Sequence, residues 1–596
     1  MPCFTQKGQL RLPFCISTLR IVVLPDFAYR MSSQAPFISP ALVTQKAVQR
    51  LPRWALLLFC AAYVIPGLLG RDPWKNEDIA SFGHMWSLAL GQASWLHPNV
   101  GGVLPTSGGV LPYWLGGAFI SVLSPFVDPA LAARIPFALL LGIVLALTWY
   151  TTYHLALTDA AQPLPLAFGG EAKPRDYARA VADGALLALI ASLGLLQLGH
   201  ETTPELLQLT GSSLFLFGLA AVSREPRQAR IAALIALPMM AASGSPAVAL
   251  MLGLAGIIVC LRSSHDEMKT HLRWVLGAMA LAAALATTLS LSGLSGWVWR
   301  VETELNVKEL VQLLIWFAWP TLPLAGLTIW HWRRQIWRRH IAVPLLAAAV
   351  GFAACMAMGG NERALLAALP PLAVLAAFAL PILQRSLGSA IDWFSVCFFT
   401  ACAGGIWLIY VAMHQGVPVK VAANVAKLVP GIQPQFSWPA LIAALIGTVL
   451  WLGLVRWRTA RQAHALWKSL VLPAGGVALC WLLFMTLWLP LLDQARSYRI
   501  VMVRMAPHIS RGDLVCAPDA PVGLLTAMEY FDGYRVNGLP LATKTTSKAG
   551  QCTRLVLRIQ AHTPAPVVPG WSKVAQYNQR THNSEQIVIY RRKANG

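Results

Sequence analysis

The sequence predicts an all-α polytopic membrane protein of about 13 transmembrane helices, followed by a small soluble C-terminal domain of α/β or α+β type. Of its 596 residues, 56% are hydrophobic and only 12% are charged. The mean hydropathy of +0.56 is too high for a soluble chain of this length. Apolar segments of near-spanning length recur until about residue 490, where the composition turns polar.

The formal net charge of +22 does not indicate a nucleic-acid-binding protein, because no basic stripe interleaved with aromatic residues occurs. Lys and Arg fall instead in short loops between apolar segments, which is a feature of membrane topology. The ten cysteines contain no CxxC pair and no spacing typical of metal ligands. No metal-binding residue is therefore predicted.

Residues 1–50 are expected to form a poorly structured cytoplasmic segment. Its apolar patch at 19–23 is too short to span a membrane, and either Met1 or Met31 can be the native start. No small-residue cleavage site of the secretory kind occurs, so the first span is expected to remain as an anchor.

Residues 51–492 are expected to form the transmembrane domain, with an outer loop over 71–130. The segment 111–127 is apolar but short, and Gly116 and Gly117 weaken it. Segments 231–242 and 246–261 are separated by Ser243-Gly-Ser-Pro246, and form either a shallow hairpin or one long broken helix. The thirteen candidate spans are 54–70, 131–153, 181–199, 205–222, 231–242, 246–261, 274–294, 311–330, 341–358, 363–383, 391–413, 437–455 and 470–490.

The distribution of charge favours thirteen spans, with 111–127 re-entrant or interfacial and 231–261 a hairpin. Most Lys and Arg of the membrane part then fall on one side, which the positive-inside rule assigns to the cytoplasm. This places the N-terminus in the cytoplasm and the C-terminus outside. Apart from Arg134 at a boundary, the outer side holds only Arg71, Lys75, Arg300, Lys308, Arg363, Lys420 and Lys427.

Residues 493–596 are expected to form the soluble outer domain. Strands are predicted at 499–503, 513–516, 555–559 and 586–590, with a helix at 526–531. Cys516 and Cys552 either form a disulfide, which suits an oxidising compartment, or remain as two buried thiols. The segment contains no catalytic triad, phosphate-binding loop or metal cluster.

The most informative stretch, residues 71–84, follows the first span directly. Glu77 and Asp78 stand where an amphipathic helix begins, and on that helix Glu77 shares a face with Ser81 and His84. Charge between apolar segments is unfavourable unless it is used. The alternative is that Asp72 or Asn76 caps an interfacial helix whose dipole the acids complement. The residues alone favour neither interpretation.

Other polar residues of the outer side also gather in few loops, which suggests a shared polar cavity. Each loop has a structural alternative, such as a solvated helix end or an Arg that extends to lipid headgroups. The loops lie at 97–113, 200–205, 297–309, 359–363 and 414–436.

Over most of residues 50–490 the chain resembles the GT-C class of membrane glycosyltransferases, specifically the bacterial relatives of protein O-mannosyltransferases and of the lipid A aminoarabinose transferase. The family's acidic dipeptide in the first outer loop is similar to Glu77-Asp78, here in reversed order. The other matching segments are Leu111-Pro-Tyr-Trp114, Ala130-Leu-Ala-Ala-Arg-Ile-Pro136, His200-Glu-Thr-Thr-Pro204 and Arg363-Ala-Leu-Leu-Ala-Ala-Leu-Pro-Pro-Leu372.

The resemblance implies transfer of a sugar, with inversion, from a polyprenyl-phosphate donor to a lipid A, glycan or protein acceptor at the outer face of a bacterial inner membrane. It implies that Glu77 is the general base and that Asp78 supports it. The family's Lys-Pro before the aromatic segment is missing, since the chain has Pro105-Thr-Ser-Gly-Gly109. The implied substrate-binding residues are Arg71, Lys75, His84, Tyr113, His200, Glu201, Arg300 and Arg363.

Two other function classes stay open from the sequence. A transporter or flippase for lipid-linked sugars would have discontinuous helices at matching places in two repeats, and the break at 243–246 has no clear counterpart. A non-catalytic glycan-assembly protein is consistent with the reversed acids. No cofactor is expected, no nucleotide-sugar site is expected without a Rossmann-like glycine loop, and a need for a divalent metal is left open. The sequence does not identify the sugar or the acceptor.

Overall fold

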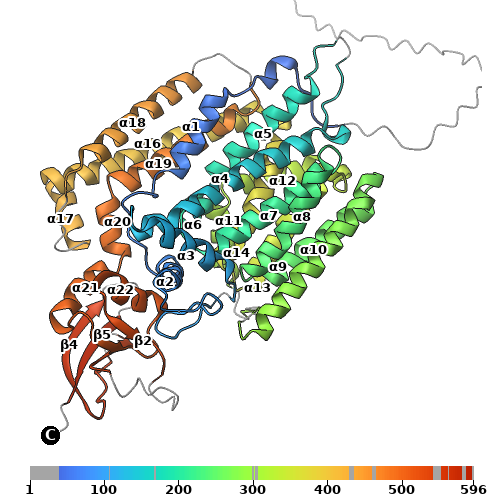
Figure 1. Cartoon of the computed structure of the whole chain (residues 1–596). Coiled ribbons are helices and arrows are strands. Elements are labelled where there is room, and N and C mark those ends of the chain that lie inside the picture. Colours follow the sequence, from blue (N-terminus) through green and yellow to red (C-terminus); the bar gives the residue numbers. More distant parts are fainter. Residues whose placement is uncertain are drawn as a thin grey trace, which may run out of the picture. The chain divides into compact units, whose positions relative to one another are not determined.

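The computed structural model describes residues 39–593, except for positions 107, 167–168, 295, 298–300, 303–305, 429–434, 460–464, 541–551, 561–562 and 580–584. A helical part is followed by a domain that contains the only sheet among these residues (Figure 1).

The helical part begins with α1 (Arg53–Val64), and two short helices, α2 (Glu77–Ala89) and α3 (Leu111–Leu123), separate it from the long α4 (Pro129–Ala156). The helices that follow are α5 (Pro174–Ala191), α6 (Leu193–Leu198), α7 (Pro204–Ala221), α8 (Pro226–Ala242), α9 (Pro246–Arg262), α10 (Asp266–Leu291), α11 (Val307–Phe317), α12 (Thr321–His331), α13 (Arg339–Ala357), α14 (Glu362–Leu365), α15 (Leu369–Ala379), α16 (Arg385–Gln415), α17 (Val419–Leu428), α18 (Trp438–Thr459), α19 (Lys468–Thr486) and α20 (Leu489–Arg496). Short 3₁₀ turns lie at Gln45–Val48, Asp159–Ala161, Arg333–Gln335, Leu366–Ala368 and Leu380–Ile382.

Local sequence explains where many of these helices start. Proline occupies the first turn of α4, α5, α7, α8 and α9, where its missing N–H has no intrahelical acceptor in any case. At α4 the side chain of Asp128 also accepts hydrogen bonds from the backbone N–H groups of Ala130 and Leu131, at 2.9 and 3.3 Å. The start of α4 is therefore fixed by its own residues.

Seven helices of the described residues are long and apolar enough to cross a membrane, or eight if α11 and α12, which are bent by 93°, form one span. Each of the thirteen expected segments coincides with a helix or with a broken run of helices. Several of them are short, so the number thirteen stays a prediction. With 13 residues, α3 is about 20 Å long and does not cross a ~30 Å hydrocarbon core.

The segment 231–261 forms a hairpin and not one long broken helix. The chain reverses at Gly244, whose φ of +87° is open to glycine. With 17 residues each, α8 and α9 are about 25 Å long, so the hairpin is deeper than expected.

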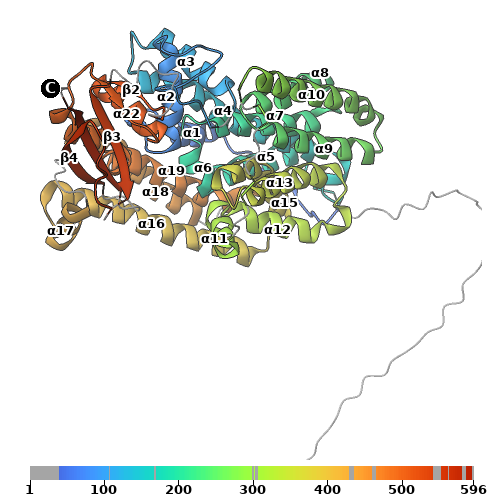
Figure 2. The ribbon, with the colours of Figure 1, turned by 90° about the horizontal axis from the view of Figure 1, so that it is seen from below.

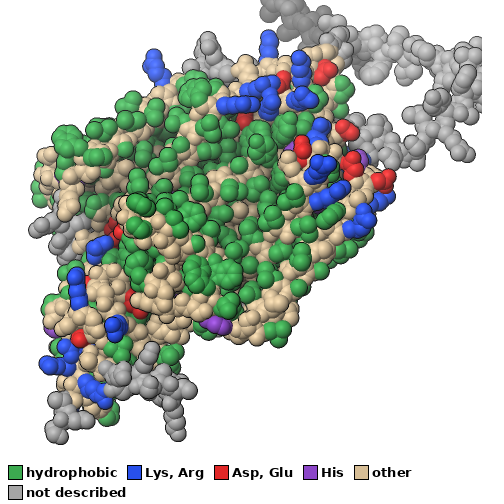
Figure 3. All heavy atoms as spheres, in the orientation of Figure 1, with side chains coloured by type: hydrophobic (Ala, Val, Ile, Leu, Met, Phe, Trp, Pro, Cys, Tyr) green, Lys and Arg blue, Asp and Glu red, His purple; other side chains and the backbone are tan. Residues whose placement is uncertain are grey.

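A broad hydrophobic band covers the helical part in Figure 3, and Lys and Arg side chains gather beyond it at one end. Large apolar side chains stand exposed in that part, among them Leu139 (60%), Ile446 (55%) and Val449 (65%). Such a surface suits lipid rather than water.

The C-terminal domain, which we define as residues 499–593, contains α21 (Arg499–Met505), a 3₁₀ turn at Ala506–His508, α22 (Val522–Asp532) and five strands. The strands are β1 (Leu514–Cys516), β2 (Arg535–Asn537), β3 (Arg554–Gln560), β4 (Trp571–Gln579) and β5 (Glu585–Arg592). Their order is β2-β1-β3-β5-β4, and β1 is parallel to both of its neighbours while the other pairs are antiparallel.

The prediction of a strand at 499–503 is wrong, because this segment forms the helix α21. Its Met502 and Met505 are buried in the core of the domain, a spacing of three that a helix satisfies and a strand does not. The strands expected at 513–516, 555–559 and 586–590 and the helix at 526–531 are present, whereas β2 and β4 were not expected. Cys516 and Cys552 are joined in a disulfide, with their Cα atoms 5.8 Å apart.

Candidate active site

The helix α2 begins at the acidic pair, directly after a residue in an unusual conformation. Asn76 has φ +73° and ψ −120°, a region that non-glycine residues rarely occupy. Such strain costs on the order of 1–3 kcal/mol and persists where surrounding contacts determine the backbone. The contacts of Asp78, two residues further on, supply that constraint.

Asp78 is buried and fully hydrogen-bonded. Its Oδ1 accepts from the backbone N–H and the hydroxyl of Thr202, at 2.8 and 2.9 Å. Its Oδ2 accepts from the backbone N–H of Trp74 at 3.1 Å and from the Arg71 guanidinium at 3.2 Å. With four donors on two oxygens, this carboxylate has no position left for a proton or a substrate.

The charges around Asp78 keep it ionised. Burial by itself raises the pKa of Asp78, but Arg71, Arg134 and the N–H groups of Thr202 and Trp74 outweigh it and hold the pKa below its ordinary value. Arg71 also donates to the carbonyl oxygen of His200 at 2.9 Å. Asp78 and Arg71 thus join the start of α2 to the loop between α6 and α7.

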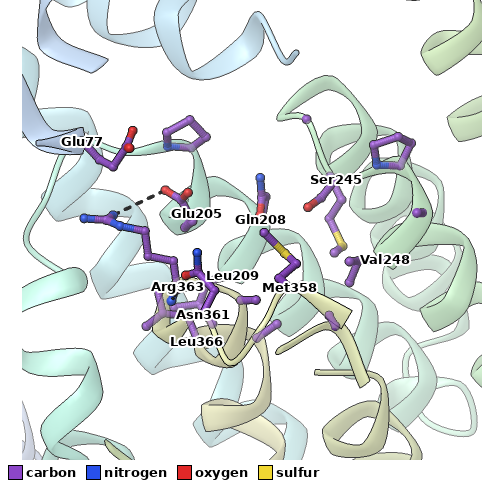
Figure 4. A pocket seen from close by; sticks show the side chains of 18 of the residues that line it. Glu77, Glu205, Gln208, Leu209, Ser245, Val248, Met358, Asn361, Arg363 and Leu366 are labelled. Carbon is purple, nitrogen blue, oxygen red and sulfur yellow. Dashed lines mark hydrogen bonds and ion pairs between the residues drawn. The ribbon is translucent and has the colours of Figure 1, made fainter. Parts of the chain in front are cut away.

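Glu77 has the opposite environment. Its side chain is exposed and lines a cavity of about 170 Å³, and it makes no hydrogen bond or ion pair with any residue that the structure describes (Figure 4). Adjacent residues of a helix point about 100° apart, so one helix start can bury Asp78 and present Glu77. Glu77 is therefore a carboxylate that is open to a ligand.

The cation of this cavity is Arg363. One of its nitrogens lies 2.6 Å from Glu201 and another 3.7 Å from Glu205, the contact that Figure 4 marks. Its backbone N–H is bound by the side chain of Asn361 at 2.9 Å, which fixes the start of α14. Burial raises the pKa of Glu201, and the charge of Arg363 opposes that rise. Glu77 lies near enough to Arg363 for the two charges to attract.

The remaining wall comes from elements far apart in the sequence. Ser81 of α2, Tyr113 of α3, the α8–α9 turn with Ser245 and the end of α13 at Met358 all line the cavity. Gln208 of α7 donates to the carbonyl oxygen of Ser243 at 2.8 Å and so ties α7 to the hairpin. Sequence reasoning singled out Tyr113 and Arg363 but missed Gln208, Ser245 and Asn361. The break at 243–246 and the polar loop at 359–363 were the available signals.

Several expected site residues lie elsewhere. Lys75 does not line the cavity, because its ammonium points to the carbonyl oxygen of Ala495 at 3.4 Å. His200 packs between Tyr63 and Trp481. His84 is buried against Tyr113, with ring centroids 5.2 Å apart, and burial lowers its pKa to about 3. Arg300 lies outside the described residues.

No group of three or more His, Cys, Asp or Glu residues in the described parts of the chain is arranged to hold a metal ion.

The membrane helices, the two short helices before α4 and the C-terminal domain together have the GT-C fold that the sequence resembles. The solved structures that share it include two of ArnT from Cupriavidus metallidurans, one bound to undecaprenyl phosphate and one in the apo state. Both have a TM-score of 0.59 and 14% identity, and cover 98% of the ArnT chain and 91% and 90% of this one. No family model and no curated protein matches the sequence. At this identity the likeness establishes the fold alone.

Proposed function

We propose that the chain is a membrane glycosyltransferase that moves a sugar from a polyprenyl-phosphate donor to a lipid, glycan or protein acceptor at the outer face of a bacterial inner membrane. The observation that carries this proposal is the unpaired carboxylate of Glu77, which shares a cavity with Arg363. The fold supports it, because an ArnT structure with that fold holds undecaprenyl phosphate.

In this proposal Glu77 is the general base. It takes the proton of the acceptor nucleophile while that atom forms a bond to the anomeric carbon of the sugar, on the face opposite the phosphate. The bond from this carbon to the phosphate oxygen breaks, and the oxygen leaves with the electron pair. The anomeric centre is inverted, and Arg363 stabilises the negative charge on the departing phosphate.

The size of the cavity limits what it holds. Ligand pockets commonly measure roughly 300–1,000 Å³, and this one measures about 170 Å³. It is therefore too small to hold an isoprenoid chain. The chain is expected to lie along the apolar surface of the helical part, in the lipid.

Glu77→Gln tests the role of the base, because the amide keeps the size of the side chain but cannot accept a proton at this position. We expect turnover to fall by about 10²–10⁴-fold. Purified variants would be assayed with undecaprenyl-phosphate-linked pentoses and hexoses that carry a radioactive sugar, with membranes of a deletion strain as acceptor.

Asp78→Asn and Glu225→Gln are the matched controls. Turnover per folded molecule should fall less in Asp78→Asn, and it should be unchanged in Glu225→Gln, which alters an exposed acid at the start of α8. Normal turnover of Glu77→Gln would show that this cavity is not the active site. Loss confined to Asp78→Asn would assign catalysis to the other acid.

The rival function, transport of a lipid-linked sugar, is tested with the same proteins. Reconstituted in vesicles, a flippase would move the labelled donor across the bilayer without acceptor, and Glu77→Gln would not stop it. A non-catalytic assembly protein would neither transfer nor move the donor.

A further inference from the structure

The helix that carries Glu77 is shared between two hydrophobic cores. Phe82 and Met85 are buried in the core of the helical part. Ile79, one turn before Phe82 on α2, is buried with Leu524, Leu525 and other residues of the C-terminal domain. Figures 1 and 2 show α22 beside α2 in both views. The C-terminal domain thus packs directly on the candidate catalytic helix.

The two helices approach each other closely at Gly83. A Cβ atom placed there would lie 1.9 Å from the hydroxyl oxygen of Thr526, and 2.7 and 2.8 Å from two carbons of the same side chain. All three distances are shorter than real Cβ contacts allow. Gly83 has an ordinary helical backbone. A glycine is needed here because it leaves room for α22, and not because of an unusual backbone conformation.

Polar contacts strengthen the same junction on both sides. Arg499 binds both carboxylate oxygens of Asp72 at 2.6 and 2.9 Å, just before α2. The hydroxyl of Tyr530 donates to Asp128 at 3.2 Å, just before α4. The Tyr530 ring also meets the edges of the Phe82 and Trp86 rings, with centroids 4.9 and 5.7 Å apart.

We propose that the C-terminal domain positions Glu77, and that Thr526 is the positioning residue, acting through Gly83. This inference rests on the proposed function. Hydrogen bonds to Asp78 fix the start of α2, whereas packing contacts set the tilt of the helix. Gly83 lies five residues further on, roughly 7.5 Å along the axis, so a second contact there fixes the tilt. A shift of about 1 Å in a reacting group can lower turnover on the order of 10²-fold.

Gly83→Ala tests the proposal, because alanine favours a helix and the three atoms nearest to its Cβ all belong to Thr526. We expect kcat to fall at least about tenfold, with KM within about threefold of wild type, in the radioactive transfer assay. Gly83→Ala with Thr526→Gly removes all three contacts and should restore kcat to within about threefold. Gly83→Ala with Thr526→Ala keeps the 2.8 Å contact to Cβ and should restore it only in part.

The control is Gly142→Ala, in α4, where nothing lies within 4 Å of the added Cβ. The single variant Thr526→Gly removes the contact to Gly83 without replacing it and should lower kcat. Proteolytic release of the C-terminal domain from the intact protein in detergent reports docking without reference to activity. It should be fastest in Gly83→Ala and slow again in the double variants.

The outcomes separate the two proposals. Normal kcat in a Gly83→Ala protein whose domain is released faster would overturn the positioning role and leave the transferase proposal standing. A loss of kcat that neither double variant reverses would also overturn the positioning role. A wild-type protein without transfer would overturn the proposed function, and this inference with it.

Discussion

Glu77 and Asp78 are adjacent carboxylates with the same chemistry, but they face different residues. Asp78 faces Arg71 and the backbone of Thr202, whereas Glu77 faces the cavity. The reversed order of the acids relative to the related family is therefore compatible with one fixed and one free carboxylate.

Asp78→Asn should destabilise the protein far more than Glu77→Gln does. The amide leaves Arg71 without its buried counter-charge and turns one acceptor into a donor that faces donors. Breaking a buried ion pair typically costs about 3–5 kcal/mol, whereas a change at an exposed site stays within about 0.5 kcal/mol. Denaturant unfolding in detergent measures both, and equal losses would contradict the assignment.

The candidate site was only partly predictable from the sequence. The motif at 75–81 and the Arg363 segment indicate a carboxylate and a cation at the outer surface. The sequence does not show which acid is buried, because that depends on Thr202, which is 124 positions from Asp78. The ion pair between Arg363 and Glu201 joins residues 162 positions apart, so the sequence does not show it either.

At the scale of elements, α20 connects the helical part to the C-terminal domain. It carries Asp493, whose carboxylate is mostly buried. Asp493 accepts hydrogen bonds from the indole N–H of Trp74 at 2.8 Å and the backbone N–H of Asp72 at 3.4 Å, both on Oδ1. Burial, with the charge of Asp72, raises the pKa of Asp493 to about 6, and Arg71 opposes that rise.

Asp493→Asn should therefore make the protein more stable near neutral pH. An acid with a raised pKa in the folded state destabilises that state as pH rises from its ordinary value of 3.8 through about 6. Asparagine keeps Oδ1 without the charge, so the gain should be absent near pH 4 and reach on the order of 2–3 kcal/mol above pH 6. Unfolding measured across this range checks it, and a gain independent of pH would exclude this cause.

The elements also show why local pattern misleads in the C-terminal domain. Residues 499–503 include three β-branched residues, Ile500, Val501 and Val503, which favours a strand. Burial of Met502 and Met505 in the domain core selects a helix instead. β4 was missed because Ser572, Lys573 and Gln576 give it a polar composition, and pairing with β5 holds it in the sheet.

The disulfide joins Cys516, at the end of β1, to Cys552, two residues before β3. Both cysteines are buried. Replacing Cys516 and Cys552 by alanine should lower the stability of the C-terminal domain by roughly 2–4 kcal/mol. Activity should fall only through that loss. Mass mapping without reductant should find the linked peptide in wild type, and two free thiols there would contradict the bond.

At the scale of the whole molecule, hydropathy predicted nearly every membrane helix, because lipid requires long apolar helices. The number of spans is less accessible, since apolar helices such as α1 are shorter than a membrane-crossing helix. The bend of 93° between α11 and α12 falls at Pro320, a residue that interrupts helices, but the size of the bend is not encoded by any period in the sequence.

The orientation in the membrane yields a direct test. Single cysteines at Trp337 and at Pro540, in a protein whose eight cysteines outside the Cys516–Cys552 disulfide are replaced, should react with an impermeant maleimide from opposite sides. The positive-inside rule assigns position 337 to the cytoplasm and position 540 to the outer side. Labelling of both from the same side would contradict thirteen spans.

The shared helix α2 has a consequence for biosynthesis. Asp72 and its partner Arg499 are 427 positions apart, and a ribosome adds about 5–20 residues per second. The helix α2 therefore waits roughly 20–85 s for the domain that completes its packing. During that interval Ile79 has no core to enter, and on the proposed function the nascent chain should be inactive until the C-terminal domain has folded.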